Sequence, residues 1–306
     1  MNISLALGGG GTRGIAHIGV LKALEEAGIH VKAIAGTSAG AIAGVFYAAG
    51  YSPDQMIELF KQMSKSHMFQ RTDQDSPSLL GLAGVTAVLE EFIGKRTFDA
   101  LKIPFACTAV DVHTSREVIF HQGPLIEPVV ASAAVPGVFP AKVIDGHTLI
   151  DGGIMDPVPV RVARMLAPDL PVVAIALSPA PTDWEGLPSL EIPYNGTIPV
   201  PRIIRERISR IRIAQAFNIF VQSADISTRL LTEARLALDK PDVIIRPCVW
   251  TSGWLDRVEP EELVRLGEEA TRERLPEIRN TRSWRKRLVR GLSFRKDHEP
   301  YYFLEG

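Results

Sequence analysis

A serine lies at the centre of residues 36–40 (GTSAG), which match the pattern G-x-S-x-G. In this pattern the serine occupies a sharp turn between a strand and a helix, so its hydroxyl is exposed at the helix N-terminus. The small residues Gly36 and Gly40 permit such a tight turn. Residues 31–35 are predicted to form the strand, and the small-residue stretch ending at Gly50 the helix. This context favours Ser38 as a nucleophile over a simple turn residue.

A glycine-rich segment, residues 8–14 (GGGGTRG), contains G-x-G-x-x-G and also lies between a predicted strand and helix. Such a turn can hold the pyrophosphate of a dinucleotide, but that function also requires an acidic residue about 20 positions later, which binds the ribose. Here the second strand ends at Ala35 and leads directly to Ser38. The alternative is an oxyanion hole, in which backbone N–H groups face the charge developing on an attacked carbonyl. Arg13 either adds charge there or orients the loop.

The histidines offer no ordered partner for the serine. In α/β-hydrolases the triad histidine follows the nucleophile and the acid along the chain. The only histidine after residue 151 is His298, near the C-terminus. A Ser-His-Asp triad is therefore not expected, although His17 and His147 stay open as bases.

Asp151 is the leading candidate for the base, because it ends an apolar strand and precedes Gly152 and Gly153. The two glycines allow a substrate or the serine to approach closely. A free aspartate has a pKa near 3.9 and is a poor base for an alcohol, so the site must be partly desolvated and must stabilise the oxyanion strongly. Three other aspartates are weaker candidates for the base. Asp111 ends a predicted strand, Asp145 lies in a predicted hairpin turn, and Asp156 is predicted to be a cap or turn residue.

The elements around these motifs alternate between strands and helices. Short apolar runs predict strands at 3–7, 31–35, 103–110, 116–121, 142–150, 172–177 and 243–249. Apolar residues at helical spacing predict helices at 14–28, 41–50, 53–66 and about 202–237, whereas 67–78 and the proline-rich 180–201 are expected to be irregular. The alternation predicts an α/β fold with a mostly parallel sheet and ligand sites at the carboxyl ends of its strands.

The composition describes an ordinary globular chain. It has 306 residues, 46% hydrophobic and 23% charged, with a formal net charge of -1 that argues against nucleic-acid binding through bulk electrostatics. Cys107 and Cys248 lie in apolar runs and are expected to be buried thiols, so neither a disulfide framework nor a metal or cofactor is expected. No signal peptide or spanning segment is recognised. The expected location is the cytoplasm or the inner face of a membrane.

The C-terminal residues differ in charge from the rest of the chain. Eight Lys and Arg residues and no acidic residue lie between Arg279 and Lys296. A helix there would carry Trp284, Leu288 and Leu292 along one stripe beside a basic face. Two interpretations stay open, a solvated or packing helix and a helix attracted to anionic lipid. The predicted organisation is a catalytic domain at 1–278 and a basic amphipathic tail at 279–306, with a second arginine-rich stretch at 202–212.

Together these motifs resemble the patatin-like phospholipases, especially compact bacterial members. The matching segments are the glycine loop at 9–14, the nucleophile box at 36–40 and the D-G-G box at 151–153, and residues 131–140 (ASAAVPGVFP) resemble a further family stretch. The resemblance implies a three-layer α/β/α fold without a cofactor. It implies a Ser38–Asp151 dyad, a nucleophile turn with Gly36 and Gly40, a dyad loop with Gly152 and Gly153, and an oxyanion hole formed by Gly9, Gly10, Gly11, Thr12, Arg13 and Gly14.

The resemblance implies a serine hydrolase that cleaves acyl esters of phospholipids or lysophospholipids through an acyl-enzyme. The competing hypothesis is a non-catalytic regulatory protein on the same fold. Covalent labelling of Ser38 separates the two hypotheses.

Overall fold

The computed structural model describes residues 1–65, 70, 72, 76, 78–186, 202–251, 253, 259–281 and 302–303, with the backbone alone for 62–65, 202–218 and 302–303. The strands are β1 (Asn2–Leu7), β2 (His30–Thr37), β3 (Phe105–Asp111), β4 (Arg116–Phe120), β5 (Lys142–Ile144), β6 (His147–Asp151), β7 (Val172–Ile175), β8 (Val243–Ile245) and β9 (Tyr302–Phe303). The α-helices are α1 (Ala16–Glu26), α2 (Ala39–Ala48), α3 (Pro53–Lys65), α4 (Ala83–Phe92), α5 (Ile126–Ser132), α6 (Val160–Leu166), α7 (Arg202–Asp239) and α8 (Pro260–Asn280). Short 3₁₀ helices are η1 (Gly11–Ile15), η2 (Phe98–Ala100), η3 (Gly152–Ile154) and η4 (Pro181–Gly186).

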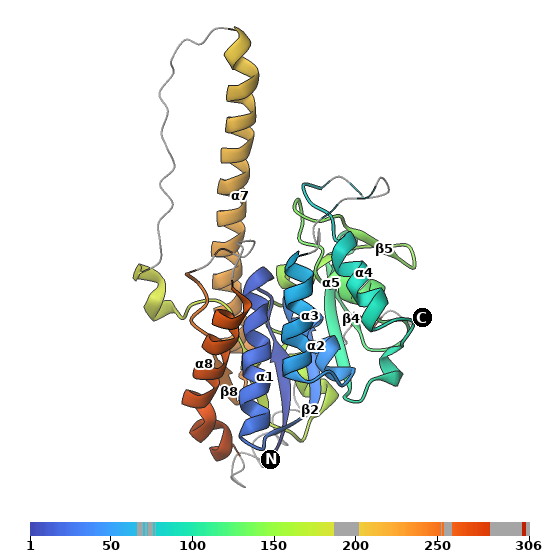
Figure 1. Ribbon diagram of the computed structural model, residues 1–306, viewed down its shortest axis with the longest axis vertical. Coiled ribbons are helices and arrows are strands. Elements are labelled where there is room, and N and C mark those ends of the chain that lie inside the picture. The colour runs from blue at the N-terminus through green and yellow to red at the C-terminus, as the bar shows by residue number, and fades with distance from the viewer. Residues whose placement is uncertain are drawn as a thin grey trace.

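The strands form one sheet in the order β5-β6-β3-β2-β1-β7-β8. Its centre, from β3 through β8, is parallel, whereas β4 and β6 run antiparallel to β3. The sheet is therefore mixed with a parallel centre, and the expected α/β class is confirmed. Helices cover both faces, which gives the three expected layers (Figure 1).

Side-chain size differs between the two faces of the sheet. In β1, Leu5 and Leu7 belong to the larger core, which includes residues of α1, α2 and α8, whereas Ala6 between them faces the smaller core with α6. Alternate residues of a strand point to opposite faces. Alanines of β2, β3 and β7 lie on the same side as Ala6, and the hydroxyl of Ser4 donates to the carbonyl of Ala163 in α6 at 2.8 Å. Small side chains thus let α6 lie close to the sheet.

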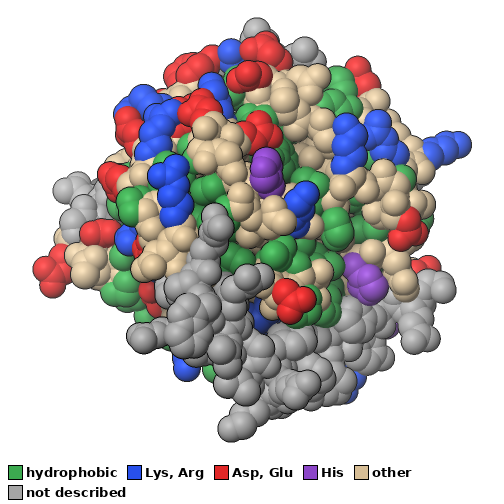
Figure 2. Space-filling view, turned by 90° about the horizontal axis from the view of Figure 1, so that it is seen from below, with side chains coloured by type: hydrophobic (Ala, Val, Ile, Leu, Met, Phe, Trp, Pro, Cys, Tyr) green, Lys and Arg blue, Asp and Glu red, His purple; other side chains and the backbone are tan. Residues whose placement is uncertain are grey.

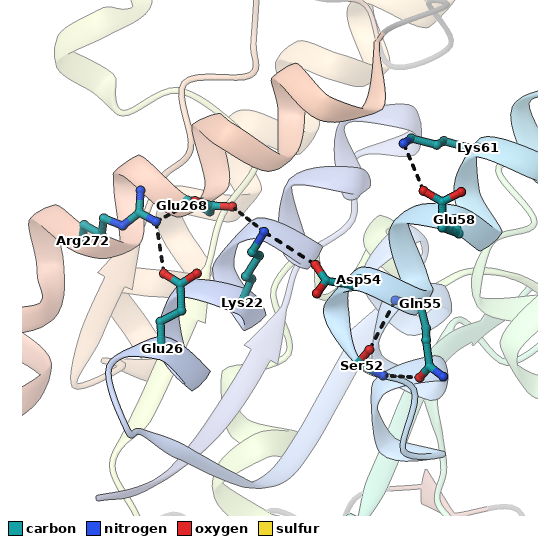
Figure 3. Close-up of polar contacts among 9 residues, drawn as sticks. All are labelled: Lys22, Glu26, Ser52, Asp54, Gln55, Glu58, Lys61, Glu268 and Arg272. Carbon is teal, nitrogen blue, oxygen red and sulfur yellow. Dashed lines mark hydrogen bonds and ion pairs between the residues drawn. The ribbon is translucent and has the colours of Figure 1, made fainter.

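Helices α1 and α8 pack side by side through two glycines (Figure 1). A methyl group on Gly19 of α1 would lie 1.9 Å from the carbonyl oxygen of Val264, and one on Gly267 of α8 would lie 2.1 Å from that of Ala16. Ion pairs flank this contact, and Lys22 reaches both Asp54 of α3 and Glu268 of α8 at 3.6 Å (Figure 3). The glycines set the separation of the two helices. The exposed ion pairs contribute little to the stability of the contact.

We expect Gly19→Ala to lower the free energy of unfolding by about 3 kcal/mol, because the helices must move apart to admit a methyl group. Urea unfolding followed by circular dichroism measures the change. Glu26→Ala, on the exposed side of α1 beside Arg272, serves as the control and is expected to change stability by about 0.5 kcal/mol or less. Equal stability of Gly19→Ala and the wild type would show that the contact is looser than the structure indicates.

Helix α7 is the longest element, with 38 residues, or roughly 57 Å at 1.5 Å per residue. Its N-terminal part projects beyond the sheet, and its C-terminal part packs on the body through Leu236, a residue of the smaller core (Figure 1). At the opposite end of the molecule, acidic and basic side chains are interspersed (Figure 2). No helix in the described part of the chain combines the length and apolarity needed to cross a bilayer.

Several sequence predictions differ from the structure. The continuous strand expected at 142–150 is divided into β5 and β6, and the hairpin turn predicted at Asp145 and Gly146 is confirmed, with φ values of 50° and 82°. The strand expected at 243–249 ends at Ile245, two residues before Pro247. Cys107 is buried as expected, but Cys248 is exposed because it follows the end of β8, so that expectation was wrong. Helices α4, α5, α6 and α8 were not anticipated.

Three predicted features fall mainly outside the described residues. These are the irregular segments at 67–78 and 180–201 and the basic helix in the tail at 279–306. The tail is described only through Thr281 and at β9, which pairs with β4. The division at residue 278 and the amphipathic tail stay predictions.

Candidate active site

The sheet register brings the two glycine-containing turns together. Leu7 at the end of β1 lies opposite Gly36 of β2, so the turns that follow the two strands emerge side by side. Thr37 in turn lies opposite Thr108 of β3, and Ala109 lies opposite Asp151 of β6. Three segments far apart in sequence therefore meet at the carboxyl end of the parallel strands.

Ser38 occupies a strained turn between β2 and α2. Its φ of 55° and ψ of -122° are unusual for a residue with a side chain, and such backbone conformations concentrate at functional sites. Glycines surround it closely, since a methyl group on Gly36 would lie 2.5 Å from the carbonyl oxygen of Gly40, and one on Gly40 would lie 2.1 Å from that of Leu7. The turn is possible only because Gly36 and Gly40, two residues before and after Ser38, lack a side chain.

A second serine helps to hold this turn. The backbone N–H of Ser38 donates to the hydroxyl of Ser132, at the end of α5, at 2.9 Å. Ser132 is fully buried. Ser132 belongs to the stretch 131–140 that resembles the family, and its pattern predicts no role for the side chain. The contact joins residues 94 positions apart, so no local pattern reveals it.

Asp151 is buried beside Ser38. The N–H of Gly153 donates to its Oδ1 at 2.7 Å. Burial raises the pKa of Asp151 from 3.8 to about 6, and the neighbouring Ser38 side chain and the hydrogen bond from Gly153 partly oppose this rise. Gly152 is required because a methyl group there would lie 2.3 Å from the Thr108 hydroxyl. The desolvated carboxylate that the chemistry requires is present.

The glycine loop places only some of its predicted residues at the site. Gly9, Gly10, Gly11 and Arg13 line the cavity at Ser38, whereas Thr12 and Gly14 do not. The N–H of Gly9 already donates to the carbonyl of Pro157 at 3.0 Å. In the described part of the chain, the N–H groups of Gly10 and Gly11 meet no backbone acceptor. Because Gly10 and Gly11 also line the cavity, the predicted oxyanion hole is best matched by these two N–H groups.

The other two residues of the loop have structural contacts. The Thr12 hydroxyl donates to the carbonyl of Gly253 at 3.4 Å. A methyl group on Gly14 would lie 2.5 Å from the Ala39 side chain, so Gly14 allows η1 to pack on the start of α2.

No histidine among the described residues lines the cavity. His17 is fully buried, and its Nε2 lies 2.8 Å from the carbonyl oxygen of Gly8. Burial lowers the pKa of His17 to about 4, so it is neutral at pH 7. Nδ1 of His147 lies 3.0 Å from Oδ2 of Asp111, away from the cavity. The two histidines that the sequence left open as bases are engaged elsewhere.

A cavity of about 140 Å³ opens at Ser38 and Asp151. Apolar side chains form much of it, among them Val135, Pro136, Ile154, Val158 and Leu177. Helix α7 forms one wall through Val221, Ala224, Asp225, Thr228, Arg229 and Thr232. The sequence predicted this helix but gave no sign that it covers the site.

A buried ionic cluster fixes α7 beside the site. Nη2 of Arg235 lies 3.0 Å from Oδ2 of Asp156, and its Nε lies 3.3 Å from Oδ2 of Asp239. Burial raises the pKa of Asp156, and repulsion from Glu117 adds to the rise. Asp156 follows Asp151 by five residues, so the cluster ties α7 to the segment carrying the aspartate. The sequence interpretation of Asp156 as a cap or turn missed this side-chain role.

The fold and site define an α/β protein with a serine on a strained turn and a facing buried aspartate. A sequence model of the patatin-like phospholipase family matches residues 5–164, more than half of the chain. The chain belongs to the patatin-like phospholipase family, and the resemblance stated from its motifs is confirmed. Membership associates it in general terms with lipid hydrolysis. Helix α7 lies outside the matched residues.

Individual relatives are similar over slightly more than half of the chain. An uncharacterized NTE family protein of Mycobacterium tuberculosis is 36% identical over 179 residues, which cover 58% of this chain and 49% of the relative. Patatin-like phospholipase domain-containing protein 6 of Homo sapiens is 34% identical over 172 residues, covering 54% of this chain and 12% of that protein. The chain thus spans about half or less of these curated relatives. The crystal structure of VipD from Legionella pneumophila superposes with a TM-score of 0.46 at 14% identity, covering 91% of this chain and 66% of VipD.

Proposed function

We propose that the protein is a serine acyl hydrolase that cleaves fatty-acyl esters of phospholipids or lysophospholipids. The observation that carries the proposal is the placement of the Ser38 side chain beside the buried carboxylate of Asp151, where both line an apolar cavity. A histidine is not needed, because burial gives Asp151 a pKa of about 6 and hence the basicity that a free aspartate lacks.

In the proposed mechanism, Asp151 accepts the Ser38 hydroxyl proton as Oγ attacks the ester carbonyl carbon. The N–H groups of Gly10 and Gly11 stabilise the resulting oxyanion. The tetrahedral intermediate collapses, and the departing alcohol takes the proton from Asp151, which leaves an acyl group on Ser38. Asp151 then accepts a proton from water, which attacks the acyl carbon. The fatty acid leaves, and the proton returns to Ser38 Oγ.

Labelling with a fluorophosphonate probe tests the nucleophile. We expect one adduct, located on Ser38 by peptide mass spectrometry, and none in Ser38→Ala. Ser52→Ala removes a serine that lies before α3 and does not line the cavity, so it should label like the wild type. Absence of labelling in a folded wild type would favour the alternative of a non-catalytic regulatory protein. Product analysis of a lipid extract, with Ser38→Ala as the blank, then identifies the ester.

The activity is expected to depend on the ionisation of Asp151. Below its pKa of about 6 the carboxyl is protonated and cannot accept the Ser38 proton, so kcat/KM should fall about tenfold per pH unit and level off above pH 7. A pH–rate profile with a short-chain ester between pH 5 and 8 measures this. A profile that stays flat down to pH 5 would exclude Asp151 as the base.

Circular dichroism at each pH separates this loss from unfolding. The folded-state pKa of Asp151 is raised, so its protonation between pH 6 and 4 stabilises the fold. His17 acts in the opposite sense, because its pKa is lowered to about 4 and its contribution to stability is lost as the pH falls below 6.5. Activity lost with the circular dichroism spectrum unchanged therefore reports on Asp151 at the site.

We also propose that the basic tail at 279–306 promotes association with anionic membranes. The support is its charge, eight Lys and Arg residues without an acid between Arg279 and Lys296. Co-sedimentation with anionic vesicles should weaken on deletion of residues 282–306. Equal binding of the truncated and full chains would exclude the tail from this role.

A further inference from the structure

Three charged side chains meet where α7 crosses the glycine loop. Nη1 of Arg13 lies 3.6 Å from Oδ1 of Asp225, and Arg229 pairs with Oδ2 of the same carboxylate. The Arg13 and Arg229 side chains are 8% and 19% exposed. All three residues line the cavity at Ser38. Two guanidinium groups thus share one carboxylate in the wall of the cavity that Ser38 also lines.

The charges of this wall do not cancel. Among the described residues that line the cavity, Asp151 is the only other ionisable group, and the proposed chemistry uses it. Glu233, one turn further along α7, is already paired with Arg246 at 2.7 Å. Arg13, Asp225 and Arg229 sum to one positive charge, which lines the same cavity as the ionised Asp151 and balances it. A partly buried positive charge favours an anionic ligand.

Arg229 also has an unused donor. Its Nε is buried and has no hydrogen-bond partner among the described residues. Buried polar groups are nearly always hydrogen-bonded, and leaving one unpaired is costly. A guanidinium group presents donors in a planar fork that matches two oxygens of one phosphate. The unpaired Nε is therefore a donor to which an oxygen of an anionic substrate can bind.

We propose that Arg229, together with Arg13, forms a subsite for the phosphate group of an acyl-ester substrate. This inference rests on the proposed function and adds to it the residues that bind the phosphate of the phospholipid or lysophospholipid substrate. Apolar lining residues such as Val135, Val158 and Leu177 provide the surface for the acyl chain. Asp225 holds the two arginines in place when no substrate is bound and competes with the phosphate for them.

Binding of non-hydrolysable ether lipids tests the subsite without any bond cleavage. The pair is 1-O-octylglycerol and 1-O-octylglycerol 3-phosphate, used as monomers and titrated by calorimetry. We expect the wild type to bind the phosphate compound about 10- to 100-fold more tightly, as charge-assisted hydrogen bonds allow. Arg229→Gln should remove most of that ratio. Arg265→Gln, which removes an exposed arginine paired with Glu269 on α8, should keep it.

Two further variants distinguish phosphate binding from misfolding and from a purely structural role of the cluster. Arg229→Lys keeps the charge without the planar fork and should retain only part of the ratio, about a third or less. Asp225→Asn removes the competing carboxylate and should tighten binding of the phosphate compound. A cluster that serves only to hold α7 would instead lower the melting temperature in each variant and leave the binding ratio unchanged, which would overturn the proposal.

Three other results would each decide between the subsite, its ligand and the proposed hydrolase. Equal affinity of the wild type for the two ether lipids would overturn the subsite even if ester hydrolysis is observed. Inorganic phosphate that displaces the phosphate compound with equal affinity would assign the site to free phosphate, and would overturn the lipid assignment. Failure of Ser38 to react with a fluorophosphonate would count against the hydrolase alone, because the ether lipids report binding independently of catalysis.

Discussion

Ser38→Ala is expected to reduce kcat for a short-chain p-nitrophenyl ester by about 10⁴-fold or more, because no other group can form the acyl-enzyme. The oxyanion donors and the cavity remain in this variant, so a small residual rate above that of water is expected. The measurement is the steady-state rate of purified wild type and variant at pH 8, where Asp151 is ionised.

The backbone strain at Ser38 provides a useful contrast. Its φ of 55° persists whatever the side chain, and the hydrogen bond from its N–H to Ser132 does not involve the hydroxyl. Ser38→Ala should therefore melt within a few degrees of the wild type. A variant that hydrolyses the ester at more than a tenth of the wild-type rate would exclude Ser38 as the nucleophile.

Asp151→Asn is expected to lower kcat by about 10³- to 10⁴-fold with little change in KM, because the amide cannot accept the Ser38 proton. The amide oxygen can still accept the N–H of Gly153, which lies 2.7 Å from Oδ1 in the wild type. The geometry of the η3 turn should thus be preserved. Kinetics at pH 8 and fluorophosphonate labelling measure the loss independently.

The stability of this variant should change in the opposite direction. Burial raises the pKa of Asp151, so keeping it ionised at neutral pH opposes folding, and a neutral asparagine removes that cost. We expect Asp151→Asn to unfold at an equal or higher urea concentration than the wild type at pH 8. Asp111→Asn, at a carboxylate paired with His147 outside the cavity, should retain activity and lose stability. Full activity of Asp151→Asn would require another base.

The parts of the fold that the sequence predicted well are those set by local patterns. The strand–turn–helix units around residues 8–14 and 36–40 follow from short apolar runs, glycines and helical spacing. Asp151 was found because a strand, an acid and two glycines are contiguous. The family assignment relied on the same contiguous motifs and was confirmed over residues 5–164.

The features that could not be predicted from the sequence depend on contacts between residues far apart in the chain. Three such contacts join separate segments of the chain. They are the cavity wall formed by α7, the hydrogen bond from the Ser38 N–H to Ser132, and the ion pair of Asp156 with Arg235. Periodicity describes one element at a time and cannot show which elements pack together. The exposure of Cys248 has the same origin, since its apolar neighbours suggested burial while the strand had already ended.

The wall contributed by α7 also has a consequence for the order of events during synthesis. All other residues lining the cavity lie at or before Ser178, whereas the wall begins at Val221. A chain emerging from the ribosome therefore contains the serine, the aspartate and the glycine loop before the helix that encloses them. The pair of Arg13 with Asp225 joins residues far apart in the chain, and such long-range contacts form late. During synthesis, strands β1 to β7 should thus be available to pair before the α7 wall of the cavity has been made.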